Sequence, residues 1–174
     1  QEEDRRNPEK WMVLMEKFHV TVWNSVPAFM QMMMEYLKGD TDGSLLELKL
    51  VLLSGDRIPC ELPNEIRNYA AQIQVVGLGG ATEASIWSNY FIADKVSLDW
   101  GIVPYGYPLT NQKYYVLNEV LQDCPDYVKG RLYIGGEGLA YGYLNDEEQT
   151  NEKFFIHSDK KERIYDTGDN GRYW

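Results

Sequence analysis

Apolar and polar positions follow two alternating periods in the first 80 residues. Starting at Pro8, apolar residues recur at helical spacing, with Trp11, Leu14, Met15 and Phe18 on one face. A short β-branched and aromatic run follows, and the alternation of helix and strand is then repeated twice. We predict helices over 8–18, 27–37 and 63–71 and strands over 20–23, 48–53 and 73–76.

These elements predict a parallel sheet covered by helices. The segment 48–53 is an almost continuous apolar run, which is typical of a strand buried on both faces of a parallel sheet. Short loops between helices and strands favour the same α/β arrangement. Two loops, 54–56 and 77–83, follow strands and therefore fall at the carboxyl edge of the sheet, where ligands bind in open α/β folds.

The pattern changes at about Ser97, where helical periodicity stops. Short strands over 112–117, 131–134 and 163–165 are separated by Gly and Pro turns, so we predict a small antiparallel β unit in the form of a distorted barrel. The predicted boundary separates an α/β part, 1–96, from a β part, 97–174. We interpret the acidic stretch 146–148 as solvated surface.

Charge and composition exclude several classes of function. The chain has 17 Lys and Arg against 27 Asp and Glu, a net charge of −10, which argues against nucleic acid and anionic membrane as partners. Cys60 and Cys124 are too few for a disulfide framework, and His19 and His157 are far apart in sequence, so a zinc site is disfavoured. No apolar run approaches a membrane span, and we expect a cytoplasmic protein.

The segment Gly77-Leu78-Gly79-Gly80-Ala81-Thr82-Glu83 is the first candidate for chemistry. Glycine-rich turns after strands let backbone amides approach a phosphate. A dinucleotide fingerprint fails because Thr82 replaces its last glycine, which disfavours an oxidoreductase. A hydroxyl followed by a carboxylate can instead contact a phosphate and hold Mg²⁺. A tight strand–helix turn with Thr82 as N-cap is equally compatible with these residues.

Two further segments stand out. Tyr165-Asp166-Thr167-Gly168-Asp169 places an acidic residue at a glycine turn, where it can accept bonds from ribose hydroxyls. Taken alone, an ordinary hairpin turn explains it better. The segment 130–143 is dense in glycine around a strand and contains no titratable cluster, so we interpret it as backbone architecture.

Together and in this order, the three segments resemble the core motifs of the acyl-adenylating superfamily. The similarity covers nearly the whole chain and is strongest to adenylation domains of nonribosomal peptide synthetases. Gly77–Glu83 and Ile102–Leu109 resemble the branch that activates cysteine for thiazoline-containing peptides and siderophores. The resemblance implies a fold that begins as half of a flavodoxin-like parallel sheet and continues into the small β subdomain.

The same resemblance implies roles for individual residues. Thr82 and Glu83 are the implied catalytic pair, Thr82 on the α-phosphate of ATP and Glu83 as the Mg²⁺ ligand, while Asp169 holds the ribose hydroxyls. The residues implied to border adenine and substrate are Ser54, Gly55, Asp56, Gly77, Gly79 and Gly80.

The family's specificity pocket falls, position by position, on Asn24, Leu52, Ser54, Leu78, Ile86 and Trp87. This series resembles the cysteine-type pocket, in which four apolar side chains form a small cavity and Asn24 and Ser54 offer polar contacts to a thiol. Leu52 and Ile86 could equally be ordinary core residues of an α/β fold.

The implied reaction activates an amino acid with ATP to an aminoacyl-AMP, and the pocket resemblance favours L-cysteine as the substrate. The acyl group then passes to the phosphopantetheine thiol of a carrier protein beside a condensation or cyclisation domain. The family's phosphate loop and catalytic lysine have no counterpart here, so the chain resembles an internal, inactive fragment. An acyl- or aryl-CoA ligase of the same superfamily and a non-catalytic recognition module are the alternatives.

Overall fold

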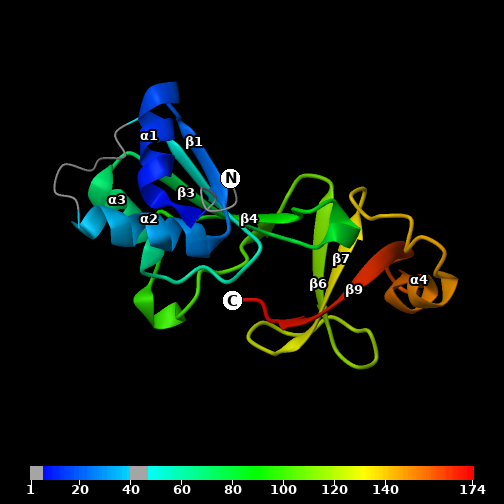
Figure 1. Ribbon diagram of the computed structural model, residues 1–174. Coiled ribbons are helices and arrows are strands. Elements are labelled where there is room, and N and C mark those ends of the chain that lie inside the picture. The colour runs from blue at the N-terminus through cyan, green and yellow to red at the C-terminus, as the bar shows by residue number, and fades with distance from the viewer. Residues whose placement is uncertain (1–5, 40–46) are drawn as a thin grey trace. The chain divides into compact units, whose positions relative to one another are not determined.

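The chain folds into two compact units, seen in a computed structural model that describes residues 6–39 and 47–174 (Figure 1). One unit comprises Gln1–Leu78 with Phe91–Gly106, and the other comprises Gly79–Tyr90 with Tyr107–Trp174. The sequence pattern predicts a single boundary between residues 96 and 97, and the division in the structure differs from it in two segments. Residues 79–90 belong with the second unit, and residues 97–106 with the first.

The first unit is built from helices and parallel strands in alternation. Its elements are α1 (Pro8–Phe18), β1 (Val22–Ser25), α2 (Pro27–Gly39), β2 (Leu50–Leu53), α3 (Leu62–Tyr69), β3 (Gln74–Gly79) and the short turn η3 (Leu98–Trp100). Asn7 caps α1 by accepting a hydrogen bond from the Lys10 N–H at 3.2 Å. The strands β1, β2 and β3 pair in parallel, with Asn24 opposite Leu52 and Leu52 opposite Val76.

One face of this parallel sheet carries the core. Val51, Leu53 and Val75 are fully buried and form a cluster with apolar side chains of all three helices. Right-handed crossovers between adjacent parallel strands place α2 and α3 on the same face, as Figure 1 shows for this unit. Because side chains alternate along a strand, Leu52 faces the other way and is only half-buried.

The second unit is mainly antiparallel. Its elements are η2 (Thr82–Ala84), β5 (Tyr107–Pro108), β6 (Gln112–Leu117), β7 (Gly130–Gly136), α4 (Glu147–Lys153), β8 (Phe154–His157) and β9 (Glu162–Gly171). The first two residues of β4 (Asn89–Ile92) also belong to this unit, and its last two belong to the first unit. Four strands form a sheet in the order β6-β7-β9-β8. The other sheet has the order β1-β2-β3-β4-β5 and is mixed, because β4 and β5 pair antiparallel. The predicted α/β class with a following antiparallel β part is therefore confirmed.

Three local features differ from the sequence expectations. The glycines at 77 and 79 belong to β3 rather than to a loop, and β9 runs on through the segment 165–169. The acidic stretch 146–148 is exposed, but it also starts α4: the Asp146 carboxylate accepts a hydrogen bond from the Gln149 N–H at 2.9 Å. A helix of seven residues without a buried side chain leaves no apolar periodicity to detect.

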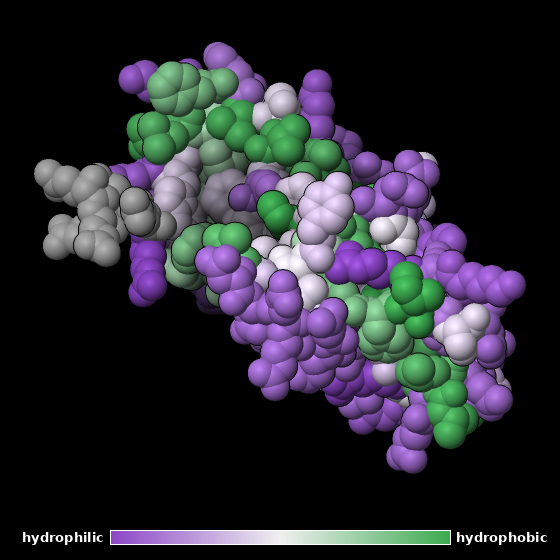
Figure 2. All heavy atoms as spheres, turned by 90° about the vertical axis from the view of Figure 1, so that its right-hand side faces the viewer, coloured by the Kyte–Doolittle hydropathy of each residue, from purple (hydrophilic) through white to green (hydrophobic). Residues whose placement is uncertain are grey.

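The cysteines and the surface agree with the composition. Cys60 and Cys124 are both free and buried, and burial raises the pKa of the Cys60 thiol. Polar side chains cover most of the face shown in Figure 2. Among the described helices, none is long and apolar enough to cross a membrane.

Gly136 offers a test of the packing where β7 ends. Its φ is +106°, and a Cβ there would lie 2.1 Å from the Asn111 carbonyl oxygen. We expect Gly136→Ala to lower the free energy of unfolding by about 2–4 kcal/mol through backbone strain and overpacking. Gly39→Ala is the control, because a Cβ at Gly39 would meet no atom within 4 Å. Equal urea midpoints for the two variants would contradict the expected clash.

Candidate functional site

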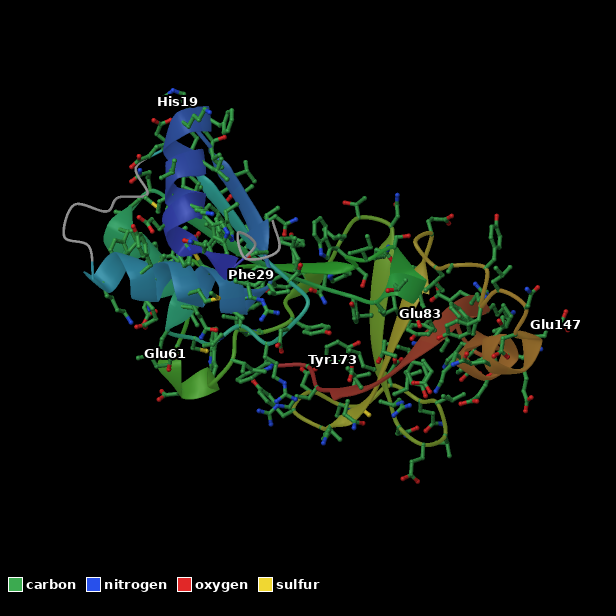
Figure 3. The ribbon with its side chains drawn as sticks, in the orientation of Figure 1. His19, Phe29, Glu61, Glu83, Glu147 and Tyr173 are labelled. Atoms are coloured by element: carbon green, nitrogen blue, oxygen red, sulfur yellow. The ribbon has the colours of Figure 1, made fainter. Side chains whose placement is uncertain are left out.

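The second unit brings all three sequence motifs into one apolar cluster. Ile134 comes from the glycine-dense second motif and Tyr165 from the third, and Ala84, which directly follows the first motif, and Phe154 of β8 complete the buried set. Ala81 of the first motif packs against this set. Figure 3 labels Glu83, whose side chain lies beside the strands of the second sheet. Segments more than 80 residues apart in sequence therefore meet around the turn that carries Thr82 and Glu83.

The backbone around this turn adopts conformations that most residues avoid. Gly80 has a φ of +145°, and a Cβ there would lie 2.6 Å from the carbonyl oxygen of Ile86. Ser85 and Ile86 also have positive φ values, 61° and 71°, which is costly for a β-branched residue. η2 is a single 3-10 turn, so no regular helix follows, and its N-cap position is Ala81 rather than Thr82. The Thr82 side chain is exposed.

Glu83 is held through both its backbone and its side chain. Its carbonyl oxygen accepts a hydrogen bond from the Ala140 N–H at 2.8 Å, and its Oε1 accepts one from the Tyr143 hydroxyl at 2.6 Å. Burial alone would raise the pKa of this half-buried carboxyl group. Hydrogen bonds from Tyr143, from its own backbone and from Tyr165 outweigh burial and lower the pKa. Glu83 is therefore an ionised carboxylate at neutral pH.

The glycine-dense segment is itself anchored. The Ser85 hydroxyl donates to the Gly138 carbonyl oxygen at 2.8 Å, which ties the segment to the turn a second time. From β9, the guanidinium of Arg163 donates to the carbonyl oxygens of Ala140 at 2.6 Å and Tyr141 at 2.7 Å. These bonds fix the backbone on both sides of Ala140, whose N–H contacts the Glu83 carbonyl oxygen. The segment is thus more than a set of glycine turns.

A polar network fixes the other end of the turn. The hydroxyls of Ser88 and Tyr114 lie 2.6 Å apart, and the Asn89 amide donates to the Tyr114 hydroxyl at 3.1 Å. Ser88 and Asn89 are almost completely buried. Sequence analysis missed these three residues and Tyr143. The adjacent polar residues Ser88 and Asn89 were the available sequence signal for such a network, because polar side chains that become buried need hydrogen-bond partners.

Asp169 lies in a bulge of β9. Arg131 pairs with Asn170 and Tyr133 with Asp166, so β9 places two more residues than β7 between these pairs. The Thr167 hydroxyl donates to the Leu132 carbonyl oxygen at 2.8 Å, and its oxygen accepts from the Asp169 N–H at 3.1 Å. The segment is therefore a bulge within a strand, not the hairpin turn that it suggested alone. The Asp169 side chain is exposed.

An ion pair stabilises this bulge. Arg131 donates to both carboxylate oxygens of Asp166, at 2.7 and 3.1 Å, and its third nitrogen donates to the Gly168 carbonyl oxygen at 2.7 Å. The Gly168 N–H donates back to Asp166 at 3.0 Å. Burial alone would raise the pKa of Asp166, but the Arg131 and Gly168 bonds lower it.

In the first unit, the implied pocket positions share the face of the sheet opposite the core. Asn24 and Leu52 are register partners, and Ser54 and Leu78 follow at alternate positions along β2 and β3. Asn24 is exposed, and the other three are half-buried.

The remaining implied residues divide between the units. In the first unit, Gly55 and Asp56 are exposed, and Gly77 is buried where a Cβ would lie 2.9 Å from Ile58. Gly79, Ile86 and Trp87 belong to the second unit. Ile86 is 67% exposed in this structure.

The metal-binding capacity of the site rests on one carboxylate. No group of three or more His, Cys, Asp or Glu side chains that could hold a metal ion occurs within residues 6–39 and 47–174. A single ionised carboxylate fits Mg²⁺ that arrives with phosphates, because this ion keeps several waters and usually takes one or two protein carboxylates. Glu83 meets that requirement.

The ion pair in the bulge yields a pH prediction. We expect Asp166→Asn to lower the free energy of unfolding at pH 7 by about 1–2 kcal/mol, a modest value because Arg131 is partly solvated. The folded pKa of Asp166 is depressed, so its contribution is complete above the unfolded value near 4 and is lost as the pH falls through the folded value. Urea unfolding of the wild type and Asp166→Asn at pH 7 and pH 3 checks this. A difference in unfolding free energy between the two proteins that is larger at pH 3 than at pH 7 would contradict it.

Comparison with known proteins places these features in a family. The sequence profile of the AMP-binding enzymes matches residues 1–144. The chain is 46% identical over 171 residues to the anguibactin system regulator of Vibrio anguillarum, covering 98% of this chain and 16% of that protein. It is 47% identical over 170 residues to bacitracin synthase 1 of Bacillus licheniformis, covering 97% and 3%. The chain thus spans a small part of these relatives.

Solved structures agree. The nonribosomal peptide synthetase FmoA3 with bound AMPPNP superimposes with a TM-score of 0.92 at 39% identity, covering 96% of this chain and 18% of that one. The N-terminal subdomain of Klebsiella oxytoca NpsA, in complex with 3-hydroxybenzoyl-AMSN, gives 0.79 at 26% identity, covering 96% and 40%. The resemblance to nonribosomal peptide synthetases is confirmed, and the chain belongs to the family of AMP-binding enzymes.

Proposed function

We propose that this chain is part of an adenylation domain that activates an amino acid with ATP for nonribosomal peptide synthesis. The observation that carries the proposal is Glu83: an ionised carboxylate on a turn that the two other motifs hold in place. FmoA3, similar over 97% of this chain, has been solved with bound α-methyl-L-serine-AMP, an adenylate of the kind that this reaction forms.

In the proposed reaction, a carboxylate oxygen of the amino acid attacks the α-phosphorus of ATP. The new oxygen–phosphorus bond replaces the bond to the bridging oxygen, and pyrophosphate leaves. The substrate is its own nucleophile, so the protein contributes positioning and charge stabilisation. Thr82, with its exposed hydroxyl, would contact the α-phosphate, and exposed Asp169 would accept bonds from the ribose hydroxyls.

The residues bordering adenine and substrate would be Ser54, Gly55, Asp56, Gly77, Gly79 and Gly80, as the resemblance implies. Mg²⁺ would be held by Glu83 and would neutralise charge on the phosphates. Loading on a phosphopantetheine thiol of a carrier protein, next to a condensation or cyclisation domain in the cytoplasm, belongs to the same proposal. The multidomain relatives, of which the chain matches 3–16%, support this setting.

We propose L-cysteine as the substrate. Asn24 and Ser54 are polar, lie on the non-core face of the first unit's sheet and retain exposed surface. Leu52 and Leu78 on the same face are apolar and half-buried. This combination suits a small side chain with one polar atom. Ile86 and Trp87 keep their place in the pocket by the resemblance.

The test of the reaction is amino-acid-dependent exchange of pyrophosphate into ATP by the natural protein that contains this chain. We expect Glu83→Gln to lower the exchange rate at least about 100-fold, since a bound Mg²⁺ contributes several kcal/mol. Glu148→Gln is the matched control, because Glu148 is exposed on α4. Retained exchange in Glu83→Gln would contradict the proposed metal role of Glu83. If the wild type showed no exchange with any amino acid, a CoA ligase or a non-catalytic module would be favoured.

The test of the substrate uses the same exchange across all twenty amino acids, in which we expect cysteine to dominate. We further expect Ser54→Ala to reduce the preference for cysteine over 2-aminobutyrate about tenfold, because the variant loses a polar partner for the thiol. Ser158→Ala, in an exposed segment of the second unit, serves as the control. A dominant signal from another amino acid would keep the reaction and discard the pocket assignment.

A further inference from the structure

We infer that Tyr143 is a positioning residue, which fixes the Glu83 carboxylate in the orientation that receives Mg²⁺ with ATP. The inference deepens the proposed function and rests on it. It also assigns a task to the glycine-dense segment: the part from Gly136 to Tyr143 is the brace of the catalytic turn.

The turn cannot set the Glu83 side chain by itself. η2 has only three residues, and the Ala84 N–H donates to the Ala81 carbonyl oxygen at 2.9 Å. A glutamate side chain has three rotatable bonds, so its carboxylate samples many positions unless another group holds it. The Tyr143 hydroxyl, 2.6 Å from Oε1, is such a group.

Tyr143 is itself held firmly enough to serve as a reference point. Its backbone N–H donates to the Thr150 hydroxyl oxygen at 2.8 Å. Its ring packs edge-on against Phe154, with 5.7 Å between centroids. The approach of Thr150 requires Gly142, where a Cβ would lie 2.4 Å from a Thr150 methyl carbon and where φ is +151°. The hydroxyl is therefore delivered from a rigid ring on a defined backbone.

Precise placement of the carboxylate matters for this ion. Mg²⁺ demands near-ideal octahedral geometry, and outer partners of metal ligands typically change metal affinity or activity 10- to 100-fold when removed. If Tyr143 only filled the apolar cluster with its ring, its hydroxyl would be dispensable. Tyr143→Phe separates the two roles, because it keeps the ring and removes the oxygen.

The experiment compares Tyr143→Phe with Tyr141→Phe in the natural protein that contains this chain. Tyr141 lies two residues away and contributes to the brace only through its backbone carbonyl oxygen, which Tyr141→Phe leaves in place. Its side chain is fully exposed, so Tyr141→Phe controls for the same substitution in the same segment. Pyrophosphate exchange is measured against Mg²⁺ concentration at fixed ATP. We expect Tyr143→Phe to need about tenfold more Mg²⁺ for half-maximal exchange, with an unchanged KM for the amino acid. Tyr141→Phe should match the wild type.

The outcomes are distinguishable from failure of the proposed function. A wild-type Mg²⁺ dependence in Tyr143→Phe overturns the positioning role and leaves adenylation standing. If the wild type shows no pyrophosphate exchange with any amino acid, the proposed function is wrong. A crystal structure of Tyr143→Phe then tests the positioning role by itself. A displaced Glu83 carboxylate supports the brace in that case, whereas an unmoved one overturns it. The positioning role would also be overturned if Tyr143→Phe and Tyr141→Phe changed the KM and the Mg²⁺ requirement by the same amounts.

Discussion

A short turn in an unfavourable backbone conformation carries Glu83, and contacts from much of the second unit hold that turn in place. Gly80, Ser85 and Ile86 all have positive φ, and strained conformations of this kind persist only where surrounding contacts determine them. The surrounding contacts come from β6, from the segment after β7 and from β9. The antiparallel sheet therefore acts as the rigid support for the turn that carries Thr82 and Glu83.

The first unit separates its core from the residues of the implied substrate pocket. Its helices pack on one face of the parallel strands, which leaves Asn24, Leu52, Ser54 and Leu78 on the other face with retained exposure. Strand order alone produces this separation, because right-handed crossovers between neighbouring parallel strands cover a single face. In the proposed function, core stability and substrate selection would therefore depend on alternate residues of the same strands. A substitution at Ser54 would then leave the buried Leu53 next to it in place.

Sequence patterns predicted most of the elements that bury apolar side chains, although they missed β8, which buries Phe154. They also failed where backbone hydrogen bonds alone define the structure. The strand 112–117 was placed at its observed ends because Val116 and Leu117 are buried. α4 was missed because it buries nothing, and the β9 bulge because only pairing with β7 creates it. Thr82, Glu83 and Asp169 could be named from motifs. Tyr143 could not, since its contact with Glu83 spans 60 residues and depends on the path of the chain.

The choice of tyrosines beside Glu83 has an electrostatic reason. A lysine or arginine would orient a carboxylate equally well, but its charge would neutralise the anion and compete with a divalent cation for it. Neutral hydroxyl donors lower the pKa of Glu83 and keep its full negative charge. Burial and the bond to Glu83 raise the pKa of Tyr143, so the donor stays protonated. Arg163, which lies over the Phe154 ring, directs its guanidinium at the carbonyl oxygens of Ala140 and Tyr141. Its positive charge thus stabilises the brace without pairing with the carboxylate that the brace presents.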